Sequence, residues 1–413
     1  MKSLLVFRLL ILIFLMICHS FQDGMNGETG HVSGGDKRNR RISECPAIFD
    51  NKCQCRRQPY PHHESEEQFV VNCTNSRFTE TTMLEDLPEE TEVLIFTGNM
   101  LNELEDNIFD FKIDHKNLKY IDFSNNHITF IRGQTFHRVR NVETLILNFN
   151  DLEITDHYQR NRIFSNFNNL KYLHLTDAFT DRYNASAYYM LSLQDIFIES
   201  NLTKLERLHL EQNEIFTIGS NASIFCPLKS LKHLYLSDNK LSDIEFEIDC
   251  LKDLNHIDVR YNMISRLSHD AMERLNKFVG VGNPLSVNLK DNPLVCDCRS
   301  RDFLEWLLKC SIKMDNIESY ICTDGFPRSV VNEEIVKVDL QEISCPGLGS
   351  KYSSDTVGFL SFLIVFMLIV LVVFGFYHKK RLATLVQPLV NDLTRKVGYR
   401  GLAHEETPAE VNV

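Results

Sequence analysis

Leu205-Glu-Arg-Leu208-His-Leu210-Glu-Gln-Asn213 decides the fold of this chain, because the same pattern returns in Leu231-Lys-His-Leu234-Tyr-Leu236-Ser-Asp-Asn239. Apolar and polar residues alternate in both stretches, which predicts a short strand whose apolar side chains turn inward. The Asn then lies at the bend after the strand, where its amide can bond backbone groups that no strand ladder satisfies. One such unit cannot bury its apolar face alone, so the units are expected to stack into a curved solenoid.

The pattern recurs along the middle of the chain as a leucine-rich repeat. Its Asn stands at Asn99, Asn126, Asn150, Asn213, Asn239, Asn262 and Asn292. The long gap before Asn213 holds a degenerate copy, in which Ala178 replaces the Asn, followed by an insertion near 179–200 that is expected to be an exposed loop. We therefore predict an α/β leucine-rich repeat solenoid of about eight repeats over residues 91–294. An ordinary α/β domain rich in Leu is the alternative.

Both ends of the chain indicate membrane targeting. Residues 1–20 have the layout of a secretory signal peptide, with a signal anchor as the alternative. Residues 357–377 carry no charge, and 21 residues at ~1.5 Å each span about 31 Å, enough to cross a bilayer as one helix. The basic run after Tyr377 places the tail, 378–413, in the cytoplasm. We expect a single-pass type I plasma-membrane protein with an extracellular N-terminus.

The charge balance narrows the class of partner. The net charge is −12, and the cytoplasmic tail is basic, so the excess of acidic residues lies in the extracellular part. An acidic ectodomain argues against nucleic acid, heparin or anionic lipid as the main ligand. It favours a protein partner of basic or mixed charge.

Eight of the twelve cysteines flank the repeats in two groups. One group precedes the first repeat and the other follows the last, which predicts disulfide-bonded caps over 45–90 and 295–346 that cover the ends of the solenoid core. Within each group of four, the sequence permits three pairings. Zinc binding is the alternative, and an oxidising compartment disfavours it. The groups are Cys45, Cys53, Cys55 and Cys73, then Cys296, Cys298, Cys322 and Cys345.

Four cysteines lie outside these groups, and one of them, Cys18, belongs to the predicted signal peptide. Cys226 and Cys250 occupy similar positions in adjacent repeats, about 5 Å apart in a stacked solenoid, which is within reach of a disulfide on the convex side. Two buried free thiols are the alternative. Cys310 then lacks a partner, and we expect it to be buried beside Trp306 or to pair between molecules. Trp306 itself is expected to pack on the core of the last repeat.

The C-terminal flank carries a resemblance to a known family. Asn292-Pro293-Leu294-Val295-Cys296-Asp297-Cys298 and Phe303-Leu304-Glu305-Trp306-Leu307 resemble the leucine-rich repeat C-terminal flanking domain, and the first cysteine group is similar to the N-terminal flank. The alternating pairing of those families implies Cys45–Cys55, Cys53–Cys73, Cys296–Cys322 and Cys298–Cys345. Residues 45–413 resemble the single-pass extracellular leucine-rich repeat proteins of animal cell surfaces. The sequon-containing interruption and the short tail of this chain further resemble those of family members that modulate Wnt signalling and cell adhesion. This resemblance implies a similar role.

Several short motifs predict modification or processing. N-glycosylation sequons stand at Asn72, Asn184, Asn201 and Asn221. Residues 21–44 have the composition of a disordered segment, and Arg38-Asn39-Arg40-Arg41 within them fits either a furin-type cleavage site or a plain basic run. We expect residues 347–356 to form a juxtamembrane linker. In the tail, Tyr399 and Leu402 fit a sorting signal, and Val411 and Val413 suit the groove of a PDZ-domain protein.

The outward-facing strand positions form the candidate binding surface. A stripe of Tyr, His and Arg runs across the middle repeats on the concave face, and Tyr and Arg are enriched at protein interfaces. The predicted ligand-binding residues are Tyr120, Tyr172, His174, Arg207, His209, His233, Tyr235 and His256. A merely tolerated surface is the alternative, and a metal or pH-sensing site is a weaker one because few carboxylates accompany the histidines.

No catalytic constellation or phosphate-binding loop stands out, so we predict neither an enzyme nor a cofactor. The leading hypothesis is a cell-surface protein that binds an extracellular or cell-surface protein ligand, in adhesion or as a co-receptor. An innate pattern-recognition receptor that works through an adaptor is the alternative.

Overall fold

The computed structural model describes residues 45–49, 52–60, 67–109, 112–153, 162–180, 186–200, 202–219, 223–345, 361–370 and 373. The predicted signal peptide, N-terminal segment, linker and tail lie outside these residues, as do the sorting and PDZ motifs. Of the predicted membrane span, 361–370 is helical with exposed apolar side chains. Among the described residues, no helix combines the length and apolarity needed to cross a bilayer.

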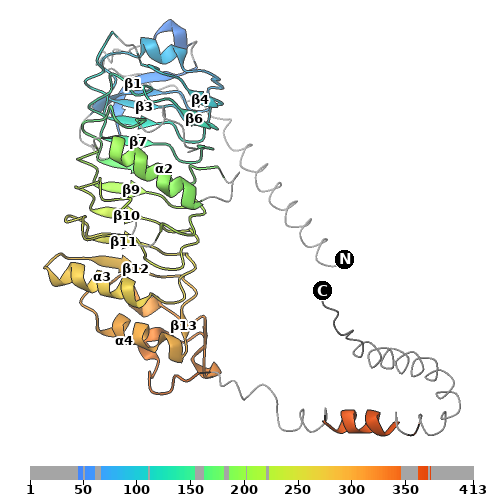
Figure 1. The fold of residues 1–413 in the computed structure, drawn as a ribbon. Helices are drawn as coiled ribbons and strands as arrows, with labels where there is room; N and C mark the ends of the chain where they lie inside the picture. Colours follow the sequence, from blue (N-terminus) through green and yellow to red (C-terminus); the bar gives the residue numbers. More distant parts are fainter. Residues whose placement is uncertain are drawn as a thin grey trace, which may run out of the picture.

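One eleven-stranded sheet runs the length of the molecule (Figure 1). Its strands are parallel and in register except for an antiparallel hairpin at the N-terminal end. The order is β1 (Gln54–Pro59), β2 (Glu67–Asn72), β3 (Val93–Ile95), β5 (Tyr120–Asp122), β7 (Thr144–Ile146), β8 (Tyr172–His174), β9 (Arg207–His209), β10 (His233–Tyr235), β11 (His256–Asp258), β12 (Ser286–Asn288) and β14 (Lys313–Met314). The eight strands from β3 to β12 coincide with the eight predicted repeats, so the solenoid prediction is confirmed.

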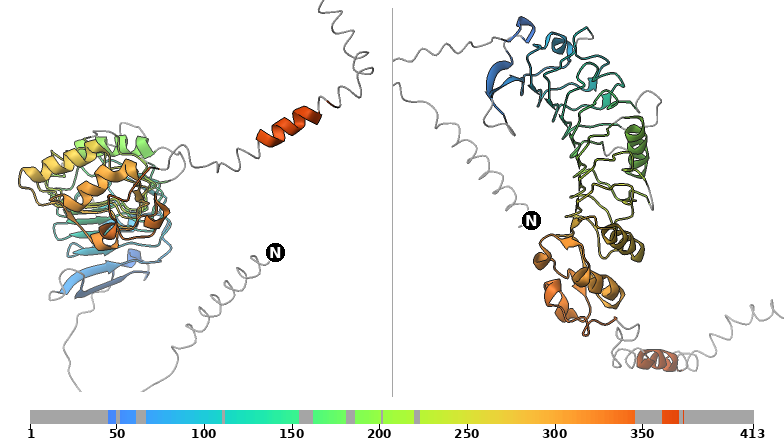
Figure 2. Two further views of the ribbon diagram at one scale, coloured as in Figure 1. Left: turned by 90° about the horizontal axis from the view of Figure 1, so that it is seen from below. Right: turned by 90° about the vertical axis from the view of Figure 1, so that its left-hand side faces the viewer.

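Three helices accompany the sheet, and the two longest lie on the convex side of the gently bent stack (Figure 2). They are α2 (Ser186–Glu199), α3 (His269–Gly280) and α4 (Arg301–Lys309). Two small parallel pairs join β4 (Glu103–Leu104) to β6 (Phe130–Ile131) and β13 (Val295–Cys296) to β15 (Asp324–Gly325). Short 3-10 turns complete the caps and loops: η1 (Ala47–Phe49), η2 (Thr82–Asp86), η3 (Cys298–Ser300), η4 (Ile317–Ser319), η5 (Arg328–Val330) and η6 (Ile335–Lys337).

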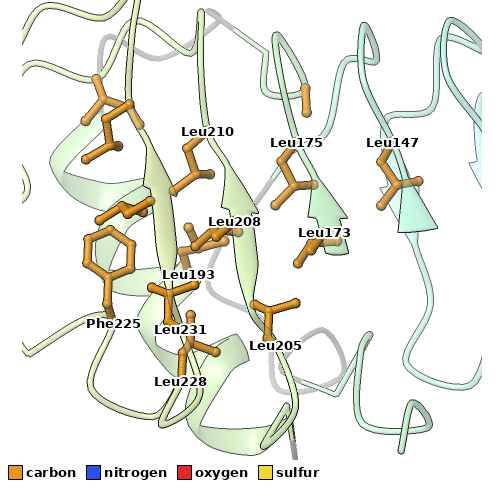
Figure 3. Packing of buried hydrophobic residues seen from close by; sticks show 14 of the residues in the cluster. Leu147, Leu173, Leu175, Leu193, Leu205, Leu208, Leu210, Phe225, Leu228 and Leu231 are labelled. Carbon is orange, nitrogen blue, oxygen red and sulfur yellow. The ribbon is translucent and has the colours of Figure 1, made fainter. Parts of the chain in front are cut away.

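The core is a continuous column of apolar side chains between the sheet and the convex loops. The middle residue of every repeat strand points into it, and Figure 3 shows the central part of this packing, with Leu173 and Leu208 from adjacent strands. All eight middle residues are fully buried: Leu94, Ile121, Leu145, Leu173, Leu208, Leu234, Ile257 and Val287. Burial of a Leu side chain contributes ~1.5–3 kcal/mol, so this column is the main source of stability.

The repeat asparagines form a second buried ladder beside the core. The side-chain nitrogen of Asn126 donates to the carbonyl of Phe96 in the preceding repeat at 2.7 Å and to that of Phe123 in its own at 2.8 Å. Its Oδ1 accepts from the backbone N–H of Asn99 at 2.8 Å. Where Ala178 replaces the Asn, Asn213 of the next repeat accepts from its N–H at 2.9 Å, so the ladder crosses the interruption.

The insertion differs from the exposed loop that the sequence analysis expected. Residues 186–199 form helix α2, whose Met190, Leu193, Ile196 and Phe197 are buried in the core. These four residues lie at helical spacing and on one face, so the segment can bury an apolar stripe that a loop would leave in water. The expectation was therefore wrong for this part of the insertion.

The caps are disulfide-bonded, as predicted. The structure contains Cys45–Cys55 and Cys53–Cys73 in the N-terminal cap, and Cys296–Cys322 and Cys298–Cys345 in the C-terminal cap. A fifth disulfide joins Cys226 to Cys250, with their Cα atoms 5.4 Å apart, across two adjacent repeats.

The sequence predicts that Trp306, in helix α4, packs on the core of the last repeat and that Cys310, just after the helix, is buried or pairs between molecules. Trp306 packs against the core but is only partly buried, and its indole N–H donates to Oδ1 of Asn276 in α3 at 2.8 Å. Cys310 follows the helix as a partly buried free thiol, and burial raises its pKa. The helix thus closes the end of the core while keeping one edge in solvent.

Candidate functional site

The outward face of the sheet presents two rows of side chains. Each repeat strand has three residues, so the first and third point away from the core while the middle one points in. The in-register pairing aligns these residues from strand to strand. The first row reads Val93, Tyr120, Thr144, Tyr172, Arg207, His233, His256 and Ser286, and the second reads Ile95, Asp122, Ile146, His174, His209, Tyr235, Asp258 and Asn288.

Three rings of the second row stack face to face across three strands. His174 of β8 lies 4.1 Å from His209 of β9 with an interplanar angle of 8°, and His209 lies 4.2 Å from Tyr235 of β10 at 12°. These centroid distances are close to the ~4.8 Å spacing of hydrogen-bonded strands, so the backbone register itself sets the stack. We call His174, His209 and Tyr235 the ring stack.

Other predicted residues adjoin the ring stack. The His256 ring lies 5.6 Å from Tyr235, and the His233 ring lies 5.9 Å from His256. On the other flank, the exposed Arg207 guanidinium lies over the Tyr172 ring at 5.5 Å. Seven of the eight predicted residues, all except Tyr120, therefore form one continuous surface over β8–β11, which we call the ring surface.

A carboxylate that sequence reasoning missed fixes the central ring. Nδ1 of His209 lies 2.8 Å from Oε1 of Glu211, whose Oε2 accepts from the Thr176 hydroxyl at 2.9 Å. An ionised carboxylate only accepts hydrogen bonds, so in the neutral imidazole the proton is on Nδ1 and Nε2 is an acceptor. Glu211 lies two residues after His209. Residues two apart in an extended chain lie on the same face, so this spacing could have identified Glu211 from the sequence.

His256, on β11, is held in a similar way by residues at the C-terminal end of the sheet. Nδ1 of His256 lies 2.7 Å from the Ser286 hydroxyl and 3.5 Å from Asp315, which follows β14. Burial lowers the pKa of His256, against the opposing effect of Asp315. Burial, with Arg207 and His256 nearby, also lowers the pKa of His233. Both rings therefore favour the neutral form.

The margin of the surface carries charges that neutralise one another. The residues just before the strands alternate in sign, and Lys171 pairs with Glu143 at 2.8 Å. Lys232 pairs with Glu206 at 3.1 Å. Hydrogen bonding to Glu143 raises the pKa of Lys171, so this lysine stays charged and paired. The charged residues at the margin of the ring surface are therefore paired with one another. The ring surface itself is distinguished by its aromatic side chains.

Tyr120, the eighth predicted residue, lies apart from this surface. Thr144 and Ile146 of β7 separate it from Tyr172 and His174. Tyr120 instead contacts Tyr60, just after β1, with ring centroids 5.1 Å apart and a hydrogen bond between the side chains. The N-terminal hairpin thus reaches over the beginning of the sheet, a contact that no repeat pattern encodes.

A cavity elsewhere on the solenoid contains none of the predicted residues. It has a volume of about 780 Å³ and is lined by Asp106, Arg132, His137, Arg162 and Asn166 among others. Within the described residues, no group of three or more His, Cys, Asp or Glu side chains is placed to hold a metal ion.

Comparison with known proteins agrees with this architecture. The leucine rich repeat family matches residues 89–152 and 203–264. Trophoblast glycoprotein of Macaca fascicularis is 24% identical over 327 residues, which cover 75% of this chain and 70% of that protein. The CD180 antigen of Mus musculus is 27% identical over 228 residues, and the match spans only 32% of its length.

Among solved structures, the crystal structure of human trophoblast glycoprotein, also titled Wnt-activated inhibitory factor 1, shares the fold. It superimposes with a TM-score of 0.57 and 22% identity, covering 67% of this chain and 94% of that one. Taken with the repeats, the disulfides and the matched residues, this likeness identifies the architecture. The chain is a leucine-rich repeat protein with disulfide-bonded, cysteine-rich caps, similar to trophoblast glycoprotein over about 75% of its length.

Proposed function

We propose that this protein acts at the cell surface and binds an extracellular or cell-surface protein through the ring surface on β8–β11. The observation that carries the proposal is the ring stack, in which three aromatic side chains of adjacent strands are aligned and remain partly exposed. Aromatic residues are enriched at protein interfaces relative to the rest of the surface. Aromatic side chains and Arg bring large contact areas with polar tips, and they dominate the binding energy of protein interfaces.

The rigidity of this surface supports the same proposal. The strands fix the ring spacing, Glu211 fixes His209, and the Tyr172 ring supports Arg207. A partner therefore meets side chains that are already ordered, which lowers the entropy lost on binding. The acidic composition of the chain favours a partner of basic or mixed charge.

The test is a screen of the ectodomain, presented as a tetramer, against secreted and cell-surface proteins. A hit is then measured with the double variant His209→Ala, Tyr235→Ala. We expect these changes to weaken binding at least as much as typical hot spots do, about 2 kcal/mol or more. Binding that survives the double variant would place the site elsewhere on the solenoid.

Matched controls come from the same two rows. Thr144→Ala and Ile146→Ala lie on β7, one strand before the ring surface, and we expect both to bind the partner normally. A further control, Lys171→Ala, breaks the charged margin without touching a ring. Loss of binding in all three controls would indicate a partner that covers the whole face rather than the ring surface.

The biological role that we propose is in adhesion or in the modulation of a receptor at the plasma membrane. The predicted signal peptide and membrane span support this location, as does the likeness to trophoblast glycoprotein. Because the human structure is titled Wnt-activated inhibitory factor 1, Wnt signalling is the first pathway to measure. A Wnt reporter assay with the wild type and the double variant would connect the ring surface to the pathway.

A further inference from the structure

Asn72 extends the second row beyond the repeats. It is the last residue of β2, and the pairing of β2 with β3 places it opposite Ile95. Its side chain is partly exposed on the outward face of the sheet. Asn72-Cys73-Thr74 is also the first of the four sequons, and the other three asparagines lie outside the described residues.

The local geometry shows which end of the Asn72 amide is available to carry a sugar in the folded protein. Its Oδ1 accepts from the backbone N–H of Thr74 at 3.0 Å and from the Thr74 hydroxyl at 2.6 Å. A backbone N–H can only donate, so this contact identifies the oxygen end of the amide. The amide nitrogen, Nδ2, therefore points away from Thr74. Nδ2 is the atom to which an N-linked sugar is bonded.

We propose that Asn72 carries an N-linked oligosaccharide that stands on the outward face of the sheet and covers its N-terminal end. In the transfer, Nδ2 bonds to the anomeric carbon of a lipid-linked oligosaccharide, the lipid pyrophosphate leaves, and the amide loses one proton. A sugar in this position lies over Ile95, the residue opposite Asn72 on β3. The hairpin and the sugar together close the face before β7.

The position of the sugar also limits the partner, and this part rests on the proposed function. Four strand intervals separate Asn72 from His174, about 19 Å at the usual ~4.8 Å spacing. The first sugar residues are bulky and hydrated, and they exclude a protein partner from the strands that they cover. The ring surface begins where this cover ends, so the partner is confined to the C-terminal half of the face.

Occupancy is tested on the full chain expressed in mammalian cells and recovered from the cell surface. Enzymatic release of the sugars in heavy-oxygen water converts a modified Asn to labelled Asp, which peptide mass spectrometry detects. We expect the label at position 72 in the wild type and in Thr74→Ser, and none in Thr74→Val. An unmodified Asn72 in the mature surface protein would overturn the proposal.

Shielding is tested with a cysteine placed in the same row. Ile95→Cys is exposed to a polyethylene glycol maleimide on intact cells, with and without Asn72→Gln, and Ile146→Cys serves as the distant control. We expect Ile95→Cys to react several-fold faster once the sugar is lost, and Ile146→Cys to react equally in both backgrounds. Equal rates for Ile95→Cys would show that the sugar does not cover the face.

These measurements need no partner, so they can fail or succeed independently of the proposed function. When a partner is in hand, Asn72→Gln is expected to bind it as the wild type does. Loss of binding in that variant would mean that the sugar is part of the site, which contradicts the confinement.

Discussion

The two faces of strands β8–β11 are built from alternate residues of the same strands, yet they are ordered in different ways. On the inward face, Leu208 is fully buried and packs against the leucines of adjacent repeats. On the outward face, its neighbour His209 keeps 18% of its side chain exposed and is ordered by stacking and by Glu211. The difference shows that residue parity along a strand separates the packed core from the partly exposed face through which we propose that the protein binds its partner.

The largest test of this comparison is Leu208→Ala. Removing a fully buried Leu leaves a cavity that the packed repeats cannot fill, so we expect a loss of about 2–5 kcal/mol in the free energy of unfolding. Urea denaturation followed by circular dichroism measures it. The matched control is the adjacent outward residue, Arg207→Ala, for which a comparable loss would abolish the distinction between the faces.

The asparagine ladder should come next in effect. Asn239 donates to the carbonyls of Leu210 and Leu236 at 2.9 and 3.0 Å and accepts from the N–H groups of Asn213 and Ile215, both at 3.0 Å. Asn239→Ala leaves these buried groups without partners, at a cost of about 1–3 kcal/mol. The exposed neighbour variant Lys240→Ala is the control in the same denaturation assay, and equal midpoints for the two variants would refute the expectation.

The sharpest test of the outward face is His209→Ala. It removes both stacking contacts of the ring stack. Aromatic pairs contribute ~0.5–1.5 kcal/mol each, so the two contacts at the lower end of that range predict a loss of about 1 kcal/mol in stability. Partner affinity should fall more than stability does. A variant that unfolds as readily as Leu208→Ala would mean that the ring stack is structural.

Acidic pH should lower the stability of the protein through two histidines of the outward face. Burial lowers the pKa of His233 and of His256 from 6.5. The charged groups that face His233 are Arg207, His256 and Lys232, which lower its pKa further, and Glu206, which raises it. Those that face His256 are Asp315 and Asp258, which raise its pKa, and Arg260 and Lys313, which lower it. A histidine with a lowered pKa takes up its proton more readily in the unfolded chain. Its contribution to stability is therefore intact above pH 6.5 and is lost as the pH falls from there through the lower folded pKa.

Thermal unfolding measured over a pH series checks this expectation. The double variant His233→Gln, His256→Gln should lose less stability than the wild type between neutral and mildly acidic pH. Identical slopes for the two proteins would show that these histidines are not responsible.

The smallest expected effect is a gain. Phe149 precedes the repeat Asn150 with a φ of 55° and is 51% exposed, whereas the neighbouring repeats place Asn125 and Asp177 at this left-handed position. Phe tolerates this conformation poorly, so Phe149→Asn should raise stability by up to about 1 kcal/mol. Met100→Asn, at an exposed site without positive φ, should bring no gain, and a loss in Phe149→Asn would contradict the argument.

The repeat solenoid was predictable because its apolar and Asn positions recur at fixed offsets, and strand register follows from them. The two rows of outward residues follow from the same register. Helix α3 was missed although its apolar residues, such as Met272 and Leu275, lie at helical spacing after the N-cap Ser268, because only strand offsets were followed there.

Contacts between different parts of the fold were beyond the sequence. Tyr60 reaches Tyr120 across two strands, and Asp315 reaches His256 from the C-terminal cap. Both contacts depend on how a cap turns back over the sheet, which no local pattern specifies. Asp258 and Asn288, which the row pattern places on the outward face, are buried near this cap for the same reason.

The Cys226–Cys250 disulfide has a mechanical consequence. In the proposed adhesive role, the protein is held between its membrane and a partner on another cell and is pulled from both ends. A solenoid without crosslinks then yields by peeling one repeat from the next. This bond closes a segment with a sequence separation of 24, which contains β10 and Tyr235. Under tension the covalent loop cannot lengthen, so the repeats on either side extend first, and the middle of the ring surface keeps its shape the longest.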